Sequence, residues 1–295
     1  MANSIRDNIQ RAIGPADTLQ RLLIANVAVF LLVRITNSVS ELFLHPVFDV
    51  YTVTSWVAVP ADLGALLHRP WSLITYMFFH WDFMHILFNM LWLYWMGRIF
   101  QEYLGNRKLL VVYFLGGLAG ALFYIASYNL FPLFANALPQ SSAIGASASV
   151  LAITIAAATL VPDYPIQLLF IGRVALKWVA VVTLLLDLIS ISGSNAGGHL
   201  AHLGGALFGF IYVRQLRAGR DIGNWLSRIF DKLTFRKIPV MQVKYSRGKT
   251  DEDYLTVKKS KQERLDDILD KISKSGYGSL SKEEREFLFS QSKDK

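Results

Sequence analysis

The stretch from Asn195 to Phe210, NAGGHLAHLGGALFGF, places a small residue at every fourth position, namely Gly197, Ala201, Gly205 and Gly209. Residues four apart lie on one face of a helix, so these form a stripe along which another helix can approach backbone to backbone. Apolar residues surround the stripe. The pattern therefore indicates a helix that packs tightly against a second helix inside a membrane.

The stretch IGASASVLAI, from Ile144 to Ile153, begins a segment with a matching pattern. Its small residues also recur every four positions, at Ala148, Ala152 and Ala156. Two such stripes can bring helices close enough for side chains beside the stripes to touch. We therefore expect the segments 143–161 and 199–216 to pack against each other.

The composition extends this expectation to the whole chain, since 53% of its 295 residues are hydrophobic and only 18% are charged. A membrane-spanning helix needs about 20 mostly apolar residues. Six segments approach that length, at 20–38, 72–97, 108–127, 143–161, 174–193 and 199–216. The sequence therefore predicts an all-α, polytopic membrane protein, in which Arg34 of the first span reaches the nearer membrane surface.

Basic residues are concentrated after the last span, since 20 of the 30 Lys and Arg lie between Arg214 and Lys295. The connections 128–142 and 194–198 contain no Lys or Arg. Because Lys and Arg accumulate on the cytoplasmic side, we expect both termini in the cytoplasm. The start of the chain lacks the apolar segment of a signal peptide. The net charge of +8 reflects this topology and does not indicate nucleic-acid binding.

Polar residues gather at one membrane face, because the second, fourth and sixth spans all begin at the outer side. Ser147 opens the fourth span, and His202 follows Ala201 beside the glycine stripe of the sixth. A serine hydroxyl becomes a nucleophile when an adjacent base activates it, and a neutral imidazole suits that role. We therefore predict a Ser147–His202 catalytic dyad. Ser149 points about 160° away from Ser147, and we expect it to bond a carbonyl of its own helix.

The second span, FFHWDFMHILFNMLW, offers further donors, since His85 and Asn89 are four residues apart and share a face. Together with the N–H of Ser147 at its helix start, they could stabilise an oxyanion. The alternative for His85 and Asn89 is a hydrogen-bonded pair between helices. For His80 we expect a place at the rim near the headgroups, which is also the alternative for the whole polar cluster.

Two other roles for these polar groups remain open. Asp187, within the fifth span, could orient a histidine as the third member of a triad, or could be a structural group bonded to a neighbouring helix. His199, His202 and His85 could bind zinc, but catalytic zinc usually has three protein ligands, often including a carboxylate. Because no H-E-x-x-H motif and no cysteine is present, we expect neither a metal nor a cofactor.

At these residues the chain resembles the rhomboid family of intramembrane serine proteases, over about 20–216. The family motif G-x-S-G appears as Gly145 to Ala148, and G-x-x-x-A-H-x-x-G-x-x-x-G appears as Gly197 to Gly209. The H-x-x-x-H-x-x-x-N-type pattern is represented by His85 and Asn89. The resemblance implies a six-helix fold of the bacterial type and a place in a bacterial inner membrane. It also implies a hydrolase that cuts peptide bonds of membrane-spanning substrates near their outer ends, through an acyl-enzyme.

The chain departs from the family pattern at several positions. Ala148 replaces the second glycine of G-x-S-G, and Leu151 replaces an aromatic residue that stacks on the catalytic imidazole. Ser72 follows Trp71 where the family often has Trp-Arg, and Gln101 stands where a glutamate is common. None of these changes removes a residue of the predicted dyad.

The expected partners follow from this interpretation. They are single-span membrane proteins as substrates and the lipid bilayer, with no nucleic acid; the sequence defines no oligomeric state. A catalytically inactive rhomboid-like protein that binds membrane clients is the main alternative, but it would need no Ser–His pair. A small transporter would be expected to show internal repeats, and the sequence shows none.

These patterns divide the chain into four parts. They are a cytoplasmic N-terminal segment (1–19), the membrane domain (20–216), a basic juxtamembrane linker (217–260) and a helical-hairpin tail (261–295). Basic residues in the linker suit anionic headgroups, and its stretch DIGNWLSRIFDKL predicts an interfacial helix with Trp225 and Phe230 on the lipid side.

Two short helices are expected in the tail. The first has apolar residues at helical spacing and ends at Gly276, which can adopt the conformation that closes a helix. Ser281 and Glu284 form the capping-box pattern that starts the second. The hairpin could be a docking or regulatory module, or the tail could serve only to keep the protein soluble; it carries no catalytic motif.

Overall fold

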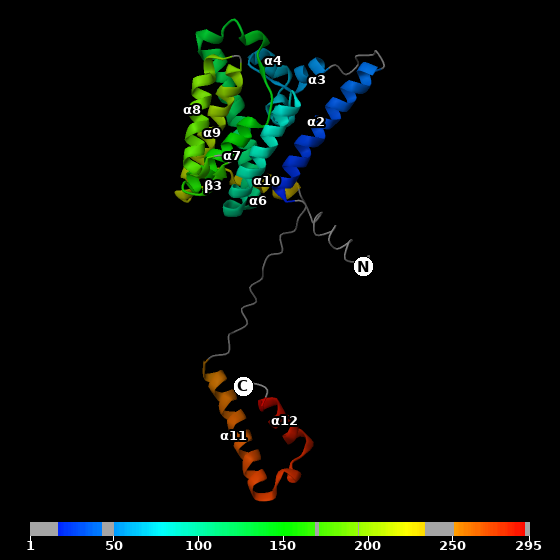
Figure 1. Ribbon diagram of the computed structural model, residues 1–295, viewed down its shortest axis with the longest axis vertical. Coiled ribbons are helices and arrows are strands. Elements are labelled where there is room, and N and C mark those ends of the chain that lie inside the picture. Colours follow the sequence, from blue (N-terminus) through cyan, green and yellow to red (C-terminus); the bar gives the residue numbers. More distant parts are fainter. Residues whose placement is uncertain (1–16, 43–49, 169–170, 194, 234–250, 293–295) are drawn as a thin grey trace. The chain divides into compact units, whose positions relative to one another are not determined.

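The computed structural model describes residues 17–42, 50–168, 171–193, 195–233 and 251–292. It divides into two compact units, Met1–Arg236 and Lys237–Lys295, and both are built mainly of helices (Figure 1). Most of the predicted N-terminal segment and the middle of the predicted linker lie outside the described residues. His45 of the first outer loop lies outside them as well.

The long helices of the first unit are α2 (Thr18–Leu42), α6 (Phe83–Leu130), α7 (Ser147–Leu160), α8 (Leu176–Ile189) and α9 (Ala196–Arg217). α6 combines the predicted second and third spans. Within it Gly105 has φ 79° and ψ 172°, which is not helical and divides α6 into two consecutive helices. The apolar helices thus match the six predicted segments, and the all-α fold class is confirmed.

Among the described helices, α2 with 25 residues and α6 with 48 residues are long and apolar enough to cross a membrane. At 1.5 Å per residue, a straight helix of the length of α6 would extend about 70 Å, roughly twice the apolar thickness of a bilayer. The break at Gly105 therefore lets α6 supply two crossings. α7 is apolar but has only 14 residues.

The predicted start of the second span at residue 72 is wrong. The chain there forms α5 (Ser72–Thr75) and the short 3₁₀ helix η1 (Tyr76–Phe78), and is irregular until α6 begins at Phe83. The cause is local, because Asp82 is the N-cap of α6 and its carboxylate accepts a hydrogen bond from the N–H of His85 at 2.9 Å. An apolar sequence alone does not reveal this interruption.

α7 is the central helix of the first unit, and every residue from Ala148 to Ala158 is buried. α9 packs directly on it. A Cβ atom built on Gly205 would overlap the carbonyl oxygen of Ala148, and one on Gly209 would overlap that of Ala152. The predicted contact between the two small-residue stripes is confirmed.

α2 contacts the rest of the unit mainly through its first half, where Leu19, Leu22 and Asn26 are buried. The Asn26 amide donates to the hydroxyl of Tyr113 on α6 at 3.1 Å, and that hydroxyl donates to the carbonyl of Met77 at 3.0 Å. Further along, α2 leans away from α6 (Figure 1), and its apolar side chains there are largely exposed. Exposed apolar side chains suit a helix that faces lipid.

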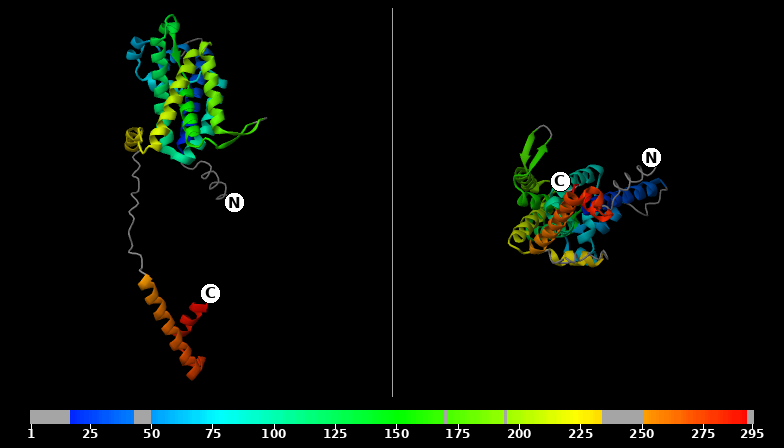
Figure 2. Two further views of the ribbon diagram at one scale, coloured as in Figure 1. Left: turned by 90° about the vertical axis from the view of Figure 1, so that its left-hand side faces the viewer. Right: turned by 90° about the horizontal axis from the view of Figure 1, so that it is seen from below.

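Short elements close the two ends of the helical unit. At the end that holds the start of α7 they are α3 (Val50–Val57), α4 (Leu63–His68), η2 (Pro132–Phe134), η3 (Leu138–Gln140), η4 (Ser190–Ser192) and the antiparallel pair of β1 (Val59–Pro60) with β2 (Ser142–Ala143). At the other end β3 (Pro165–Leu168) and β4 (Gly172–Ala175) form a hairpin that projects sideways from the helices (Figure 2).

The predicted interfacial helix is α10 (Asn224–Leu233). Trp225 is exposed, but the ring of Phe230 packs on that of Phe114 in α6, with centroids 5.6 Å apart. The expectation that both aromatic residues face lipid is therefore wrong for Phe230, which attaches α10 to the bundle instead.

The second unit is a pair of helices, α11 (Asp251–Ser275) and α12 (Lys282–Ser292), joined by the short helix η5 (Tyr277–Ser279). α11 begins before the predicted hairpin boundary at 261. Gly276 ends α11 with φ 74°, a conformation that favours glycine. Both predicted helices and the predicted stop at Gly276 are present.

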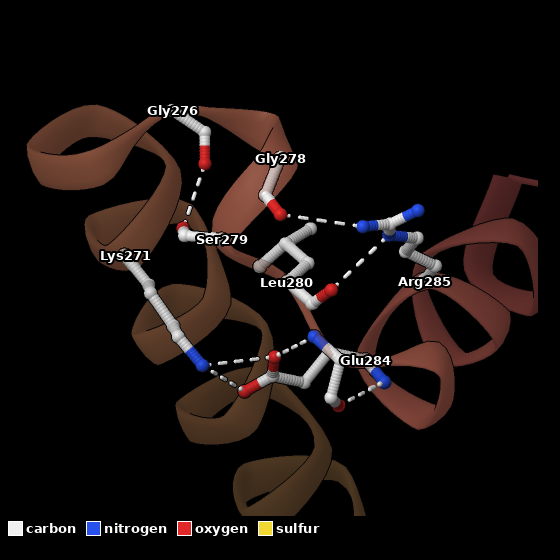
Figure 3. A network of polar contacts seen from close by, with 8 residues as sticks. Lys271, Gly276, Gly278, Ser279, Leu280, Glu284 and Arg285 are labelled. Carbon is white, nitrogen blue, oxygen red and sulfur yellow. Dashed lines mark hydrogen bonds and ion pairs between the residues drawn. The ribbon is translucent and has the colours of Figure 1, made fainter.

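The start of α12 is the predicted capping box (Figure 3). The N–H of Ser281 donates to Glu284 Oε2 at 2.7 Å, and the N–H of Glu284 donates to Ser281 Oγ at 3.3 Å. Lys271 Nζ on α11 lies 2.9 and 3.0 Å from the two Glu284 oxygens. The bond from the Ser281 N–H and then the Lys271 ammonium hold the pKa of Glu284 below its usual value.

The contact of α9 with α7 predicts that Gly205→Ala destabilises the protein. Alanine gains about 1 kcal/mol over glycine in helix propensity, but its methyl would overlap the Ala148 carbonyl. We expect the free energy of unfolding to fall by about 1–3 kcal/mol, seen as a lower melting temperature in detergent. Leu207→Ala, at an exposed position of α9, should have little effect. Equal stability of Gly205→Ala and the wild type would refute this packing.

The capping box predicts a pH dependence within the second unit. Because the pKa of Glu284 is lowered in the folded state, its contribution is present at neutral pH and is lost as the pH falls below about 4.5. Glu284→Gln should therefore speed hydrogen exchange in residues 277–292 at pH 7, and the difference from the wild type should be smaller at pH ~3. Glu283→Gln, in the same first turn, is the control and should change exchange less at both pH values.

Candidate active site

One cavity of about 1150 Å³ is lined by all four of the predicted site residues, Ser147, His202, His85 and Asn89. They come from the N-terminal parts of α7, α9 and α6, which lie at the same end of the bundle. Asp187 of α8 and His199 of α9 line the same cavity. The structure therefore brings the predicted residues together and adds two more.

The irregular segment before α6 positions the His85 ring. The backbone N–H of Trp81 points to His85 Nδ1 at 3.4 Å, so Nδ1 acts as an acceptor. In a neutral imidazole the proton then lies on Nε2. A Cβ atom built on Gly145 would lie 2.7 Å from His85 Nε2 and 3.7 Å from Ser147 Oγ. His85 Nε2, which carries the proton, and the hydroxyl of Ser147 therefore both border the space beside the Gly145 Cα atom.

Only glycine fits at position 145. Its φ of 118° is a backbone conformation that residues with side chains rarely adopt, and a side chain there would strike the His85 ring. The Gly145 N–H donates to the carbonyl of Tyr76 at 2.9 Å, and the N–H of Ala146 donates to His80 Nε2 at 3.4 Å. Ser147 is the first residue of α7. Its N–H belongs to the first turn, where N–H groups have no acceptor within the helix.

His80 does not lie at a rim as predicted. Its exposed fraction is 3%, and its ring meets that of His85 edge to face with centroids 5.0 Å apart. It also accepts the N–H of Ala146. His80 therefore supports both His85 and the turn before Ser147. The sequence placed His80 inside the predicted second span at 72–97, because the break before α6 was not foreseen.

Ser149 faces away from the cavity. Its hydroxyl has no hydrogen-bond partner, and a Cβ built on Gly117 of α6 would lie 2.5 Å from its Oγ. The predicted bond to a carbonyl of its own helix is therefore wrong. Ser149 packs as a small side chain against α6, whereas Ser147 lines the cavity.

Asp187 accepts hydrogen bonds from two histidines through one oxygen. His202 Nδ1 and His199 Nδ1 each lie 2.8 Å from Asp187 Oδ1. A carboxylate can only accept, so both Nδ1 atoms carry the proton and Nε2 of each neutral ring is an acceptor. Of the two roles that the sequence left open for Asp187, the structure shows the bond to His202 that a triad would require.

Asn89 and Ser147 make fewer contacts. The Asn89 amide donates one N–H to the carbonyl of His85 at 2.9 Å, which leaves its second N–H for another acceptor. Ser147 and His202 line one cavity, but within the described part of the chain no hydrogen bond joins them. Contacts between a nucleophile and its base are often long without substrate.

Arg34 does not simply extend to the membrane surface as predicted. Its guanidinium donates to the carbonyl of Trp81 and lies over the ring of Phe30. Because Trp81 also donates to His85, Arg34 links α2 to the segment that holds the His85 ring. Nothing in the sequence indicates this contact.

The departures from the rhomboid pattern are accommodated locally. The Ala148 methyl faces Gly120 of α6, while Gly205 meets the backbone of Ala148. The extra methyl group therefore does not separate α9 from α7. Leu151 lines the cavity, and Gln101 donates to Asp17 at 3.0 Å near the start of α2.

The structure gathers metal-ligand atoms from a different set of residues than the sequence analysis considered. The ligand atoms of Asp187, His199 and His202 all lie within 4.8 Å of one another. His85 is not part of this group. Asp187 provides the carboxylate ligand that was missing from the three histidines considered in the sequence analysis.

The structure is a helical membrane bundle with a serine, three histidines and a buried aspartate around one cavity, and this arrangement defines the class of the protein. The family model described as a rhomboid domain matches residues 67–218, more than half of the chain, and the chain belongs to the rhomboid family. It is accordingly an integral membrane protein. A second family model, a family of unknown function (DUF6576), matches residues 249–294, which contain α11 and α12.

Two curated relatives illustrate the similarity. The chain is 28% identical to "RHOMBOID-like protein 12, mitochondrial" of Arabidopsis thaliana over 220 residues, which cover 71% of this chain and 61% of that protein. It is 41% identical to "Rhomboid protease GlpG" of Salmonella newport (strain SL254) over 61 residues, which cover 21% of this chain and 22% of that protein. The matches thus span less than two thirds of either relative.

The different surroundings of the two serines predict selective labelling. A fluorophosphonate, which reacts with activated serine hydroxyls, should label the wild-type protein and Ser149→Ala but not Ser147→Ala or His202→Ala. The readout is the phosphonylated peptide identified by mass spectrometry. Labelling that persists in Ser147→Ala and disappears in Ser149→Ala would show that the assignment is reversed.

Proposed function

We propose that this protein is an intramembrane serine endopeptidase that cleaves membrane-spanning segments of other proteins. The observation that carries the proposal is the bond from His202 Nδ1 to Asp187, since it leaves Nε2 of His202 able to accept a proton. His202 and Ser147 line the same cavity. A serine beside such a base can act as a nucleophile.

The reaction begins with attack of Ser147 Oγ on the scissile carbonyl carbon, while His202 Nε2 takes the hydroxyl proton. The tetrahedral intermediate collapses when His202 returns that proton to the leaving amine, and an ester to Ser147 remains. Water then attacks the ester with His202 again as the base, which releases the acid and restores Ser147. Asp187 is a positioning residue here, because it holds the ring and stabilises the imidazolium that forms.

Three donors surround the site of the developing oxyanion. They are the N–H of Ser147, the Nε2–H of His85 and the free amide N–H of Asn89. The Gly145 and Ala146 N–H groups already have acceptors, so the Ser147 N–H is the first one available in this turn. Loss of one such donor typically reduces the rate constant about 10²–10³-fold.

The substrate must present an accessible peptide bond to this cavity. The carbonyl of an intact helix is hydrogen-bonded and shielded, so the substrate has to unwind locally. The cavity lies at the end of the bundle remote from the β3–β4 hairpin and α10. Because Arg173, Lys177 and Arg217 lie at the hairpin end of the first unit, the positive-inside rule favours a cavity at the outer face and both termini in the cytoplasm.

Co-expression with a tagged single-span membrane protein tests the proposal. We expect cleavage by the wild-type protein and none by Ser147→Ala, with equal amounts of both proteins in the membrane. Asn89→Ala should cut about 10²–10³-fold more slowly. The measurement is the amount of tagged fragment, with its new end determined by mass spectrometry.

Ser149→Ala is the matched control, because this serine is on the same helix but outside the cavity. It should cleave like the wild type. If a panel of clients is bound but never cut, the protein acts as a client-binding member of the family. Cleavage that survives Ser147→Ala would exclude the proposed chemistry.

A further inference from the structure

We propose that Asp187, His199 and His202 form a zinc-binding site and that bound Zn²⁺ switches off the protease. The inhibitory effect rests on the proposed function of His202, whereas the binding itself does not. The three residues come from α8 and α9, so the site depends on the packing of these helices. Zinc here is an inhibitor and takes no part in the reaction.

The geometry already gathers the three ligands. Both Nδ1 atoms lie 2.8 Å from Asp187 Oδ1, and the ligand atoms of the group lie within 4.8 Å of one another. Ligands at about 2.0–2.2 Å from zinc in a tetrahedral arrangement are separated by slightly more than 3 Å. Small movements of the rings would therefore admit an ion between them.

Asp187 provides an independent indication. Its exposed fraction is only 5%, and its second oxygen, Oδ2, is buried without a hydrogen-bond partner. A buried carboxylate oxygen without a partner is costly. Coordination of a cation by this carboxylate would compensate its negative charge, which the two neutral imidazoles do only through hydrogen bonds.

The donor set selects the kind of metal. Two imidazole nitrogens and one carboxylate oxygen are typical zinc ligands, and a fourth position is left for water. Mg²⁺ and Ca²⁺ prefer oxygen ligands and should bind poorly. The site is accessible, because His199 and His202 have side-chain exposed fractions of 23% and 21% and line the cavity.

Binding of zinc changes the tautomer of His202. The ion needs the lone pair of Nδ1, so the Nδ1 proton leaves to water and Nε2 takes up a proton in exchange. The ring stays neutral, but Nε2–H can no longer accept the proton of Ser147. The metal therefore removes the base without touching the serine, and its removal restores the original tautomer.

Full-length protein in detergent provides the first measurement. Zn²⁺ at micromolar concentration should reduce cleavage of a single-span client at least tenfold, a chelator should restore it, and Mg²⁺ should have no effect. His199→Gln keeps a hydrogen-bond donor for Asp187 but removes one ligand. The zinc concentration for half inhibition should rise at least tenfold in this variant, relative to its own metal-free activity.

His68→Gln is the control, because His68 is exposed in α4 and hydrogen-bonds to the Gly64 carbonyl. It should leave the inhibition unchanged. Co²⁺ binding, followed by the visible absorption of the tetrahedral ion, gives a readout that needs no activity. The spectrum should appear with Ser147→Ala and vanish with Ser147→Ala combined with His199→Gln.

The outcomes separate the two proposals. Zinc inhibition that is equal in His199→Gln and the wild type would overturn the proposed site, as would the absence of a cobalt spectrum in Ser147→Ala. If the metal-free protein cuts no client but the cobalt spectrum depends on His199, the zinc site stands and the proposed protease function fails.

Discussion

The arrangement of the cavity depends on the direct backbone contact between α7 and α9. Gly205 and Gly209 have no side chains, so α9 can lie against the carbonyls of Ala148 and Ala152. The hydrophobic effect does not drive helices together within lipid, so close van der Waals packing has to supply the attraction. A side chain at either glycine would move α9 away from α7, and with it His202 away from Ser147. The same two glycines therefore determine both the packing of α9 on α7 and the position of His202 relative to Ser147.

The second requirement is that the irregular backbone before α6 has hydrogen-bond partners. In the segment before α6, the Trp81 carbonyl accepts from Arg34 and the Trp81 N–H donates to His85. His80 of the same segment accepts the N–H of Ala146. This short irregular stretch therefore fixes two histidine rings and the turn before Ser147. Irregular backbone at membrane depth is tolerated where protein or a water-filled cavity satisfies it. The break before α6 is therefore part of the site and not a defect in a spanning helix.

Much of this could be predicted from the sequence, because the determining signals are local. Small residues four apart predicted the α7–α9 contact, and Ser281 with Glu284 predicted the start of α12. The roles of His80 and Arg34 could not be predicted, and the role of Asp187 could only be left open, since each depends on a partner in another element of the structure. Asp187 meets His202 only because α8 packs on α9, and no spacing in the sequence encodes that pairing.

The shared use of Asp187 has a consequence for the proposed chemistry. One oxygen receives two Nδ1–H groups, so His199 competes with His202 for the same acceptor. The imidazolium that forms on His202 during acyl transfer strengthens its own bond to Asp187, because charge-assisted hydrogen bonds are roughly twice as strong as neutral ones. The preference for His202 therefore arises in the reacting state. In the resting state both histidines are 2.8 Å from the same Asp187 oxygen. A cation that binds both rings can therefore displace both Nδ1 protons.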